Sequence, residues 1–243
     1  MALVETRALT RAFNKNPPVV LDVDLDAQAG EVLGLIGPNG GGKSTLLMLI
    51  AGLVSPTSGT VRIDGVDSNA LAQQTTGAVG LISAVPGLYP LLSGWENLEY
   101  FGGLNNLSAA EVRQRSVDLV TKLGITDQMD RQVKEYSSGM QQKVSLVRAL
   151  LMKPKLLLLD EPTSNLDPVS THIIHKTVRD QANKGVGVIL CTHDLHAAEY
   201  ICDKVAVMQQ TVRAVEAVPG ERRSPDLGHL YKMYETHVEE VQS

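Results

Sequence analysis

A run of nine residues, GPNGGGKST at 37–45, limits the possible folds more than any other segment of this sequence. It directly follows an apolar segment, VLGLI at 32–36, and leads into a leucine-rich segment at 43–51. A strand, a glycine-rich loop and a helix in that order bring successive backbone N–H groups together around phosphate oxygens. The helix N-terminus adds its partial positive charge at the same point. The run therefore predicts a site for the phosphates of a nucleotide within an α/β fold.

Each residue type in this loop has its own expected task. Lys43 is placed to reach the β and γ phosphates, and the Ser44 hydroxyl is placed to bind Mg²⁺. The other expected nucleotide-binding residues of the loop are Gly37, Pro38, Asn39, Gly40, Gly41, Gly42 and Thr45. The alternative is a glycine-rich turn that only caps a helix, and the flanking strand and helix argue against it.

A second, acidic element supports a nucleotide site. Four leucines at 156–159 predict a buried strand, and Asp160 and Glu161 follow it directly. Asp160 is suited to the Mg²⁺ shell, and Glu161 is suited to orienting or deprotonating the attacking water. A strand end followed by a helix N-cap is the alternative for these two carboxylates. Together the two elements predict hydrolysis of a nucleoside triphosphate.

Composition narrows the class of protein. Of the 243 residues, 43% are hydrophobic and 20% are charged, which is ordinary for one large globular domain. The formal net charge of -5 gives no general electrostatic argument for binding nucleic acid. Apolar stretches fall far short of the roughly 18 to 20 residues that span a bilayer, so we expect no membrane span and no signal peptide. Cys191 and Cys202 are the two cysteines, which favours a reducing interior.

Apolar spacing predicts an α/β chain with a β-rich edge and a helical insert. Strands are expected where apolar residues alternate or run together, at 3–9, 21–25, 31–36, 60–63, 78–82, 156–159 and 186–191. Helices are expected at 43–51, 140–152, 168–182 and 226–238. In the insert, Ser108 and Glu111 predict a capping box at the start of another helix, and Gly124 predicts its end.

The segment YSSGMQQK at 136–143, shortly before Asp160, resembles the signature of ATP-binding cassette (ABC) proteins. The family's usual form is Leu-Ser-Gly-Gly-Gln. Ser137 and Gly139 keep their places here, whereas Tyr136, Ser138 and Met140 differ. A serine N-cap on a helix would account for the serines alone.

Two further segments extend the resemblance over 13–208. Ser164, Asn165, Leu166 and Asp167, shortly after Glu161, resemble the D-loop of the family. His193 follows the strand predicted at 186–191 and stands where the family has its switch histidine. A solvated turn residue is the alternative for a lone histidine after a strand, and the order of the motifs argues against it.

The resemblance implies an α/β P-loop NTPase fold, with a RecA-like parallel-sheet core, an N-terminal antiparallel β-subdomain and a helical insert. It implies a single ABC ATPase domain over 1–243. The nucleotide-binding core with its β-subdomain is expected at 1–87 and 153–218, the helical signature subdomain at 88–152, and a C-terminal loop and helix at 219–243.

The resemblance also assigns roles in a composite site. Two such domains are expected to pair head to tail, so that the signature residues Ser137, Ser138, Gly139 and Met140 of one face the γ-phosphate bound at Lys43 of the other. Glu161 is then the general base, and His193 contacts the γ-phosphate and assists hydrolysis. Phe13 matches the aromatic residue that stacks on adenine in the family, with a plain core phenylalanine as the alternative.

Two regions bear on coupling to other subunits. The family places a glutamine near Mg²⁺ at a position that is Ala84 here, so Ser83 or water would have to substitute, or metal coordination differs. The segment at 88–101 resembles the region of drug, sodium and polysaccharide exporter subunits that docks a transmembrane partner. Rich in leucine and holding Trp95, it is expected to form an exposed apolar groove, with packing of the helical insert as the alternative.

The resemblance therefore implies an ATP-binding and ATP-hydrolysing subunit of an ABC exporter, using ATP and Mg²⁺. The expected partners are transmembrane permease subunits and a second ATPase subunit, identical or different, at the cytoplasmic face of the membrane. No nucleic-acid partner is expected. A soluble ABC ATPase acting on nucleic acid or in translation, an importer subunit and a regulatory subunit without turnover are the alternatives.

Overall fold

The computed structural model describes residues 2–14, 16–74, 77–218, 234 and 236. Its core is a sheet in the order β10-β9-β3-β8-β7-β6. The strands of this sheet are β3 (Val32–Ile36), β6 (Val79–Ile82), β7 (Leu156–Asp160), β8 (Gly187–Thr192), β9 (Lys204–Gln209) and β10 (Thr211–Ala217). Pairing is parallel from β9 to β6, and β10 joins β9 as an antiparallel edge strand. The predicted parallel core is confirmed.

The central strands are apolar up to their carboxyl ends, where β7 closes with Asp160 and β8 with Thr192, because both faces of the sheet are covered. In β3, Leu33 and Leu35 pack into one core, whereas Val32 and Ile36 pack into the other. Successive side chains of a strand point to opposite faces, so each strand supplies both cores. The first core contains α1 (Lys43–Ile50), and the second contains side chains of α5 (Ser138–Leu150), α6 (Pro168–Ala182) and α7 (Leu195–Ile201).

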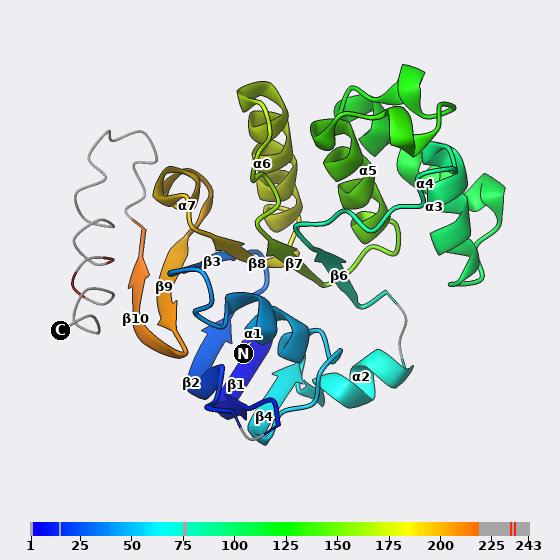
Figure 1. The fold of residues 1–243 in the computed structure, drawn as a ribbon. Helices are drawn as coiled ribbons and strands as arrows, with labels where there is room; N and C mark the ends of the chain where they lie inside the picture. The colour runs from blue at the N-terminus through cyan, green and yellow to red at the C-terminus, as the bar shows by residue number, and fades with distance from the viewer. Residues whose placement is uncertain (1, 15, 75–76, 219–233, 235, 237–243) are drawn as a thin grey trace.

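A second, antiparallel sheet has the order β2-β1-β4-β5 and lies below α1 in Figure 1. Its strands are β1 (Val4–Arg11), β2 (Val20–Ala27), β4 (Ser58–Ile63) and β5 (Val66–Asp67). The simple alternation expected at 21–25 is wrong at its first residue: Val20 is buried and Leu21 is exposed. Asp22 has φ 49° and the pairing register shifts here, so a β-bulge turns Leu21 outward.

The helical insert forms a lobe to one side of the sheet, which we call the helical lobe (Figure 1). It contains α3 (Gly94–Gly103), α4 (Ala109–Lys122) and α5 (Ser138–Leu150). The predicted capping box of Ser108 and Glu111 is confirmed, and Gly124 follows α4 with φ 67°. A second capping box, Ser93 with Glu96, opens α3. Both boxes satisfy backbone N–H groups that a helix start otherwise leaves unpaired.

The remaining helices are α2 (Ser68–Gln74), α6 (Pro168–Ala182) and α7 (Leu195–Ile201), with short 3₁₀ turns η1 (Thr126–Gln128) and η2 (Val133–Glu135). The helix predicted at 168–182 is confirmed, whereas apolar spacing did not predict α7, β9 or β10. The helix predicted at 226–238 lies outside the described residues apart from 234 and 236. Across the part of the chain that the structure describes, every helix is too short or too polar to cross a membrane.

Candidate nucleotide site

The glycine-rich loop lies between the end of β3 and the start of α1, as predicted. Its backbone needs glycine for steric reasons at two positions. Gly42 has φ 93°, and a Cβ there would lie 2.4 Å from the Val19 carbonyl oxygen. A Cβ on Gly37 would lie 2.0 Å from the carbonyl oxygen of Met208. The loop is therefore pressed between β9 and the segment before β2, which fixes where its N–H groups point.

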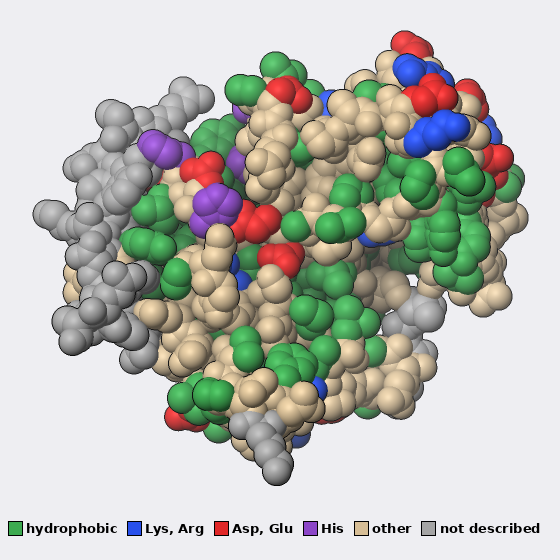
Figure 2. Space-filling view, in the orientation of Figure 1, with side chains coloured by type: hydrophobic (Ala, Val, Ile, Leu, Met, Phe, Trp, Pro, Cys, Tyr) green, Lys and Arg blue, Asp and Glu red, His purple; other side chains and the backbone are tan. Residues whose placement is uncertain are grey.

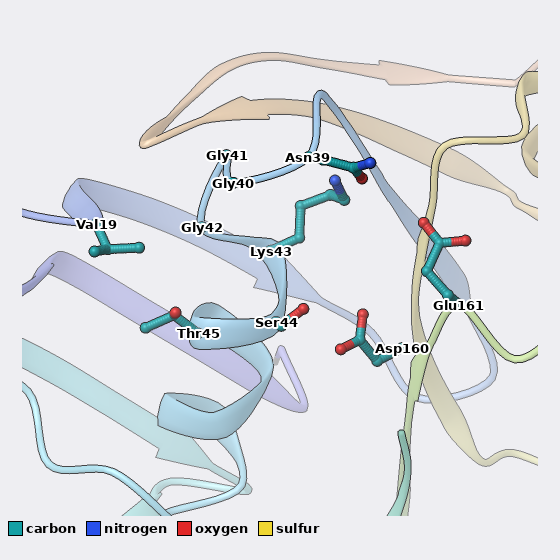
Figure 3. A pocket seen from close by; sticks show the side chains of 10 residues that line it. All are labelled: Val19, Asn39, Gly40, Gly41, Gly42, Lys43, Ser44, Thr45, Asp160 and Glu161. Carbon is teal, nitrogen blue, oxygen red and sulfur yellow. The ribbon is translucent and has the colours of Figure 1, made fainter. Parts of the chain in front are cut away.

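Lys43 is buried at the start of α1 and curls back over the loop. Its ammonium group donates hydrogen bonds to the carbonyl oxygens of Gly37 at 2.8 Å and Pro38 at 2.9 Å. Figure 3 shows the Lys43 side chain reaching toward Asn39, whereas Thr45 points to the opposite side of the helix. The single charge of the loop is thus held above its glycines, where an anionic group would be stabilised.

A cavity of about 170 Å³ opens beside the loop. Its lining consists of Val19, Asn39, Gly40, Gly41, Gly42, Lys43, Ser44, Thr45, Asp160 and Glu161. The Ser44 hydroxyl and the Asp160 carboxylate face each other across it in Figure 3. Two segments far apart in the sequence therefore meet here, and the sequence had predicted every lining residue except Val19. Val19 carries no motif, so sequence reasoning had no signal for it.

Sheet topology explains why these segments meet. The strand β8 lies between β3 and β7, with Ile36 in register with Thr192 and Asp160 in register with Cys191. The carboxyl ends of parallel strands share one edge of a sheet, and ligands bind outside that edge. The loop after β3, the carboxylates at the end of β7 and the histidine after β8 consequently converge.

Glu161 and His193 contact each other at this edge. The His193 Nδ1 lies 2.8 Å from the Glu161 Oε1. Because an ionised carboxylate only accepts hydrogen bonds, the imidazole donates from Nδ1. The His193 side chain is 59% exposed and that of Glu161 is 19% exposed. Figure 2 shows histidine and acidic side chains together on the face over the region where β3, β7 and β8 are labelled in Figure 1.

The backbone of Glu161 is held in an unusual conformation. Its φ is 49°, a left-handed value that costs free energy for a residue with a Cβ. Its N–H donates to the Cys191 carbonyl oxygen at 3.0 Å, which ties the turn to β8. The turn thus aims the carboxylate at the same edge as the glycine-rich loop.

The signature residues begin α5 and lie away from the cavity. Ser137 is the N-cap, and its hydroxyl accepts a hydrogen bond from the Met140 N–H at 3.3 Å. Ser137 and Ser138 are exposed, whereas Gly139 is buried against α6, where an added Cβ would lie 2.7 Å from the Ser170 hydroxyl. The N-cap alternative is therefore true of Ser137, and it leaves the adjacent serine free to face outward. The signature does not line the cavity around Lys43 in the same chain.

The predicted D-loop connects β7 to α6. Asn165 has φ 60° and Ser164 is exposed, while Leu166 packs on the core. Asp167 is the N-cap of α6 and accepts a hydrogen bond from the Ser170 N–H at 2.9 Å. Hydrogen bonds from Ser170 lower the pKa of Asp167. The loop presents its first two residues to solvent and anchors its last two.

Phe13 lies on the surface after β1, so it is not a core residue. Its side chain is 37% exposed, and the Arg11 guanidinium lies over the ring, 4.5 Å from the ring centroid. The segment that follows runs to Val19, whose N–H donates to the Arg11 carbonyl oxygen at 2.8 Å. One face of the ring is therefore occupied by a cation, close in sequence to the cavity lining.

The loop after β6 offers no oxygen to the cavity from the expected glutamine position. Ala84 and Ser83 are both exposed and neither lines the cavity. The Ser83 hydroxyl donates to the Val85 carbonyl oxygen at 2.6 Å, within its own loop. Ser83 therefore does not take the place of the glutamine in this structure.

The apolar groove expected at 88–101 is only partly present. Trp95 is buried at 8% exposure, so its inclusion in an exposed groove was wrong. It packs in the core of the helical lobe, and the Arg113 guanidinium lies over its ring. Tyr89 and Leu91 remain exposed. Figure 2 shows a hydrophobic patch over the side of the molecule that carries α3 and α4.

Comparison with known proteins agrees with this geometry. The family model described as "ABC transporter" matches residues 20–164. The chain is 38% identical over 193 residues to the uncharacterized ABC transporter ATP-binding protein YdbJ of Bacillus subtilis, covering 79% of this chain and 62% of that protein. It is 34% identical to the ABC transporter ATP-binding protein NatA of the same organism, over 87% of this chain and 88% of NatA. Identity to the Nod factor export ATP-binding protein I of Cupriavidus metallidurans is 33%, covering 93% and 75%.

Solved structures support the same assignment. A structure of the ATP-binding subunit of an ABC transporter superimposes with a TM-score of 0.83 at 31% identity, covering 96% of this chain and 99% of that one. A dimeric ATP-binding cassette in a post-hydrolysis state, bound to ADP and Pi, superimposes with a TM-score of 0.80 at 27% identity, covering 89% and 99%. This chain belongs to the ABC transporter family and is an ATP-binding subunit with ATPase activity.

Proposed function

We propose that this chain is the ATP-hydrolysing subunit of an exporter at the cytoplasmic face of a membrane. It works with separate transmembrane permease subunits and with a second ATPase subunit, identical or different. The exporter direction is supported by the similarity to a Nod factor export protein. The observation that carries the proposed hydrolysis is the Glu161–His193 contact at the edge of the sheet that holds Lys43, Ser44 and Asp160.

The residues beside the loop fit ATP with Mg²⁺. A hydroxyl and a carboxylate are the hard oxygen donors that Mg²⁺ prefers, and Ser44 and Asp160 face each other across the cavity (Figure 3). These two side chains would hold the ion, which would neutralise phosphate charge. Lys43 would exchange its two carbonyl partners for phosphate oxygens. The loop N–H groups would donate hydrogen bonds to the other phosphate oxygens.

Glu161 is the proposed general base. Its carboxylate takes the proton of the attacking water, and the hydrogen bond from His193 holds it in place for that transfer. His193 is exposed enough to contact the γ-phosphate as well. The aromatic face of Phe13 that Arg11 leaves open is proposed to stack on adenine.

The signature and D-loop are proposed to act on the nucleotide of a second subunit. Ser137, Ser138, Gly139 and Met140 form the N-terminal turn of α5, whose partial positive charge suits a γ-phosphate. The exposure of Ser137 and Ser138, away from the cavity of their own chain, supports this arrangement. The D-loop at 164–167 reaches that turn through its last residue, since a carboxylate oxygen of Asp167 lies 3.4 Å from the position that a Cβ on Gly139 would take. ATP would thus be enclosed between two subunits, and its hydrolysis would let them part.

The domain division that the sequence suggested is retained in this proposal. The core at 1–87 and 153–218 binds the nucleotide, and the segment at 88–152 presents the signature.

Glu161→Gln tests both the base and the composite site. The variant should bind ATP like the wild type, lose hydrolysis, and shift toward dimer in gel filtration with Mg²⁺ and ATP. Glu5→Gln, on β1, is the matched control. It should hydrolyse ATP like the wild type and show no shift toward dimer. Continued hydrolysis by Glu161→Gln would remove Glu161 as the base, and the absence of a dimer shift would contradict the composite site.

The transport assignment needs a separate experiment. The tagged chain is recovered at native expression from detergent-solubilised membranes and from the soluble fraction, and its partners are identified by mass spectrometry. A stoichiometric polytopic protein supports the exporter. Recovery from the soluble fraction alone, with nucleic acid or ribosomes attached, would overturn it.

A further inference from the structure

His175 of α6 is a buried imidazole outside the nucleotide cavity. It is only 5% exposed, and its Nε2 lies 3.2 Å from the hydroxyl of Thr163. A buried polar side chain with a specific partner is costly to leave unpaired, so the contact constrains both groups. Thr163 stands two positions after Glu161. The imidazole is therefore joined by one hydrogen bond to the segment that carries the proposed general base.

The segment at 161–167 needs such support. Glu161 and Asn165 both have left-handed backbone angles, φ 49° and 60°. Such conformations persist in residues with a Cβ only where the surroundings hold them. Because Glu161 is strained in this way, the position of its carboxylate depends on each hydrogen bond that holds the segment.

Most hydrogen bonds of the 161–167 segment lie within it or at its two ends. Glu161 is held by β8 through its N–H, and Asp167 is held by the first turn of α6. Between them, the Ser164 N–H donates to the Glu161 carbonyl oxygen and the Leu166 N–H donates to that of Thr163, both at 3.3 Å. These two bonds lie within the segment itself. The Thr163–His175 contact instead joins its middle to the body of α6.

We propose that His175 is a positioning residue for Glu161: by bonding Thr163, it holds the 161–167 segment so that the Glu161 carboxylate stays beside His193. This inference rests on the proposed role of Glu161 in hydrolysis. It adds a buried residue of α6 that lies outside the lining of the nucleotide cavity.

The surroundings of His175 favour the neutral imidazole that such a bond uses. Burial lowers the pKa of His175, His172 on the same helix adds to that effect, and Asp194 at the start of α7 opposes it. The Tyr200 ring of α7 lies 6.2 Å from the imidazole. A neutral imidazole has one donor and one acceptor nitrogen, and the Thr163 hydroxyl can pair with either.

The test uses the purified full chain with four variants: Thr163→Val, His175→Leu, their combination, and His175→Gln. Loss of one hydrogen bond predicts that each of the first two lowers kcat about tenfold. ATP affinity should stay within about twofold, since the phosphate loop is untouched. The combination should be no worse than either single change, because the two side chains share one bond. His175→Gln keeps a polar group near the same place and should recover most of the activity.

Two controls separate positioning from loss of structure. His172→Gln, on the exposed face of the same helix, should leave kcat unchanged. Amide hydrogen exchange in a peptide covering 160–167 should rise in Thr163→Val while the strands β3 and β8 keep their protection. This second readout does not depend on hydrolysis, so it also reports on variants that turn over slowly.

The outcomes are distinguishable from those of the proposed function. If Glu161→Gln abolishes hydrolysis but the Thr163 and His175 variants match the wild type, the positioning role is wrong and the base assignment stands. Additive losses in the combined variant, or lost protection across the whole protein, would also overturn it. If Glu161→Gln still hydrolyses ATP, the proposed function fails first.

Discussion

The imidazole of His193 donates from Nδ1 to the Glu161 carboxylate at 2.8 Å, although 32 residues separate the two in sequence. Each follows a different parallel strand, and the strands are neighbours in the sheet. The contact leaves Nε2 of the imidazole available to a ligand at the same edge. Glu161 and His193 are thus poised as a pair beside the glycine-rich loop.

Removing His193 tests this pair. In His193→Ala the Glu161 carboxylate loses its partner, so kcat for ATP hydrolysis should fall about 10²-fold. ATP affinity should change little, because Lys43 and the loop amides are unaffected. Steady-state ATPase measurements with His196→Ala, an exposed histidine of α7, as the control check this. Equal effects of the two substitutions would argue against a paired role.

Two glycines of the phosphate loop, Gly40 and Gly42, should respond differently to substitution by alanine. Both Gly40 and Gly42 have positive φ, so each substitution carries backbone strain of about 1 to 3 kcal/mol. Only at Gly42 does a Cβ also meet another backbone atom, the carbonyl oxygen of Val19, whereas nothing lies within 4 Å at Gly40. Gly42→Ala should therefore lower the free energy of unfolding and the ATP affinity more than Gly40→Ala. Urea unfolding and nucleotide titration measure both, and equal losses would contradict the crowded site.

Stacking on Phe13 predicts a base-dependent loss of affinity. Phe13→Ala should weaken ATP binding by about 1 to 3 kcal/mol, the size of one aromatic–base contact. Inorganic tripolyphosphate, which has no base, should bind the variant and the wild type equally. Phe13→Tyr keeps the ring and should bind ATP normally. Competition against a fluorescent nucleotide gives the affinity of each protein for ATP and for tripolyphosphate. If Phe13→Ala lost affinity equally for both ligands, Phe13 would lie outside the adenine site.

Acid should destabilise the chain partly through His175. Because burial lowers its pKa in the folded state, the unfolded chain binds more protons as the pH falls below about 6.5. The stability that His175 contributes is therefore present above that pH and is lost from there downward toward the folded pKa. Urea unfolding at several pH values between 7.5 and 5 should show a shallower pH dependence in His175→Gln than in the wild type. Identical slopes would mean that the imidazole does not stay neutral when folded.

Exposed apolar residues after β6 are candidates for contact with a permease. Leu91 is 69% exposed, so Leu91→Glu should leave folding and ATP binding intact while reducing copurification of a transmembrane partner. Leu104→Glu, at the end of α3 and similarly exposed at 62%, is the matched control. Quantitative mass spectrometry of tagged preparations compares the two. Loss of the partner in both, or in neither, would argue against a contact at Leu91.

The sequence by itself determined the fold class, the family and the place of the glycine-rich loop between a strand and a helix. The strand at 32–36, the glycines and Lys43 are adjacent in the chain, so their joint geometry follows from local backbone rules. The capping box of Ser108 and Glu111 is local in the same way and is confirmed. The roles proposed for Glu161, His193 and the signature remain predictions, although the structure places the first two in contact.

Only the tertiary structure decided features that depend on partners distant in sequence. Periodicity did not identify β9, because its place beside β3 is set by pairing between segments far apart in the chain. Leu21 is exposed because a bulge shifts the register of β2, and Trp95 is buried because the helical lobe closes over it. The hydrogen bond between His175 and Thr163 likewise forms only once the loop before α6 folds back against that helix. Local patterns encode the turn and the helix cap, whereas burial and strand order arise from the packing of the whole chain.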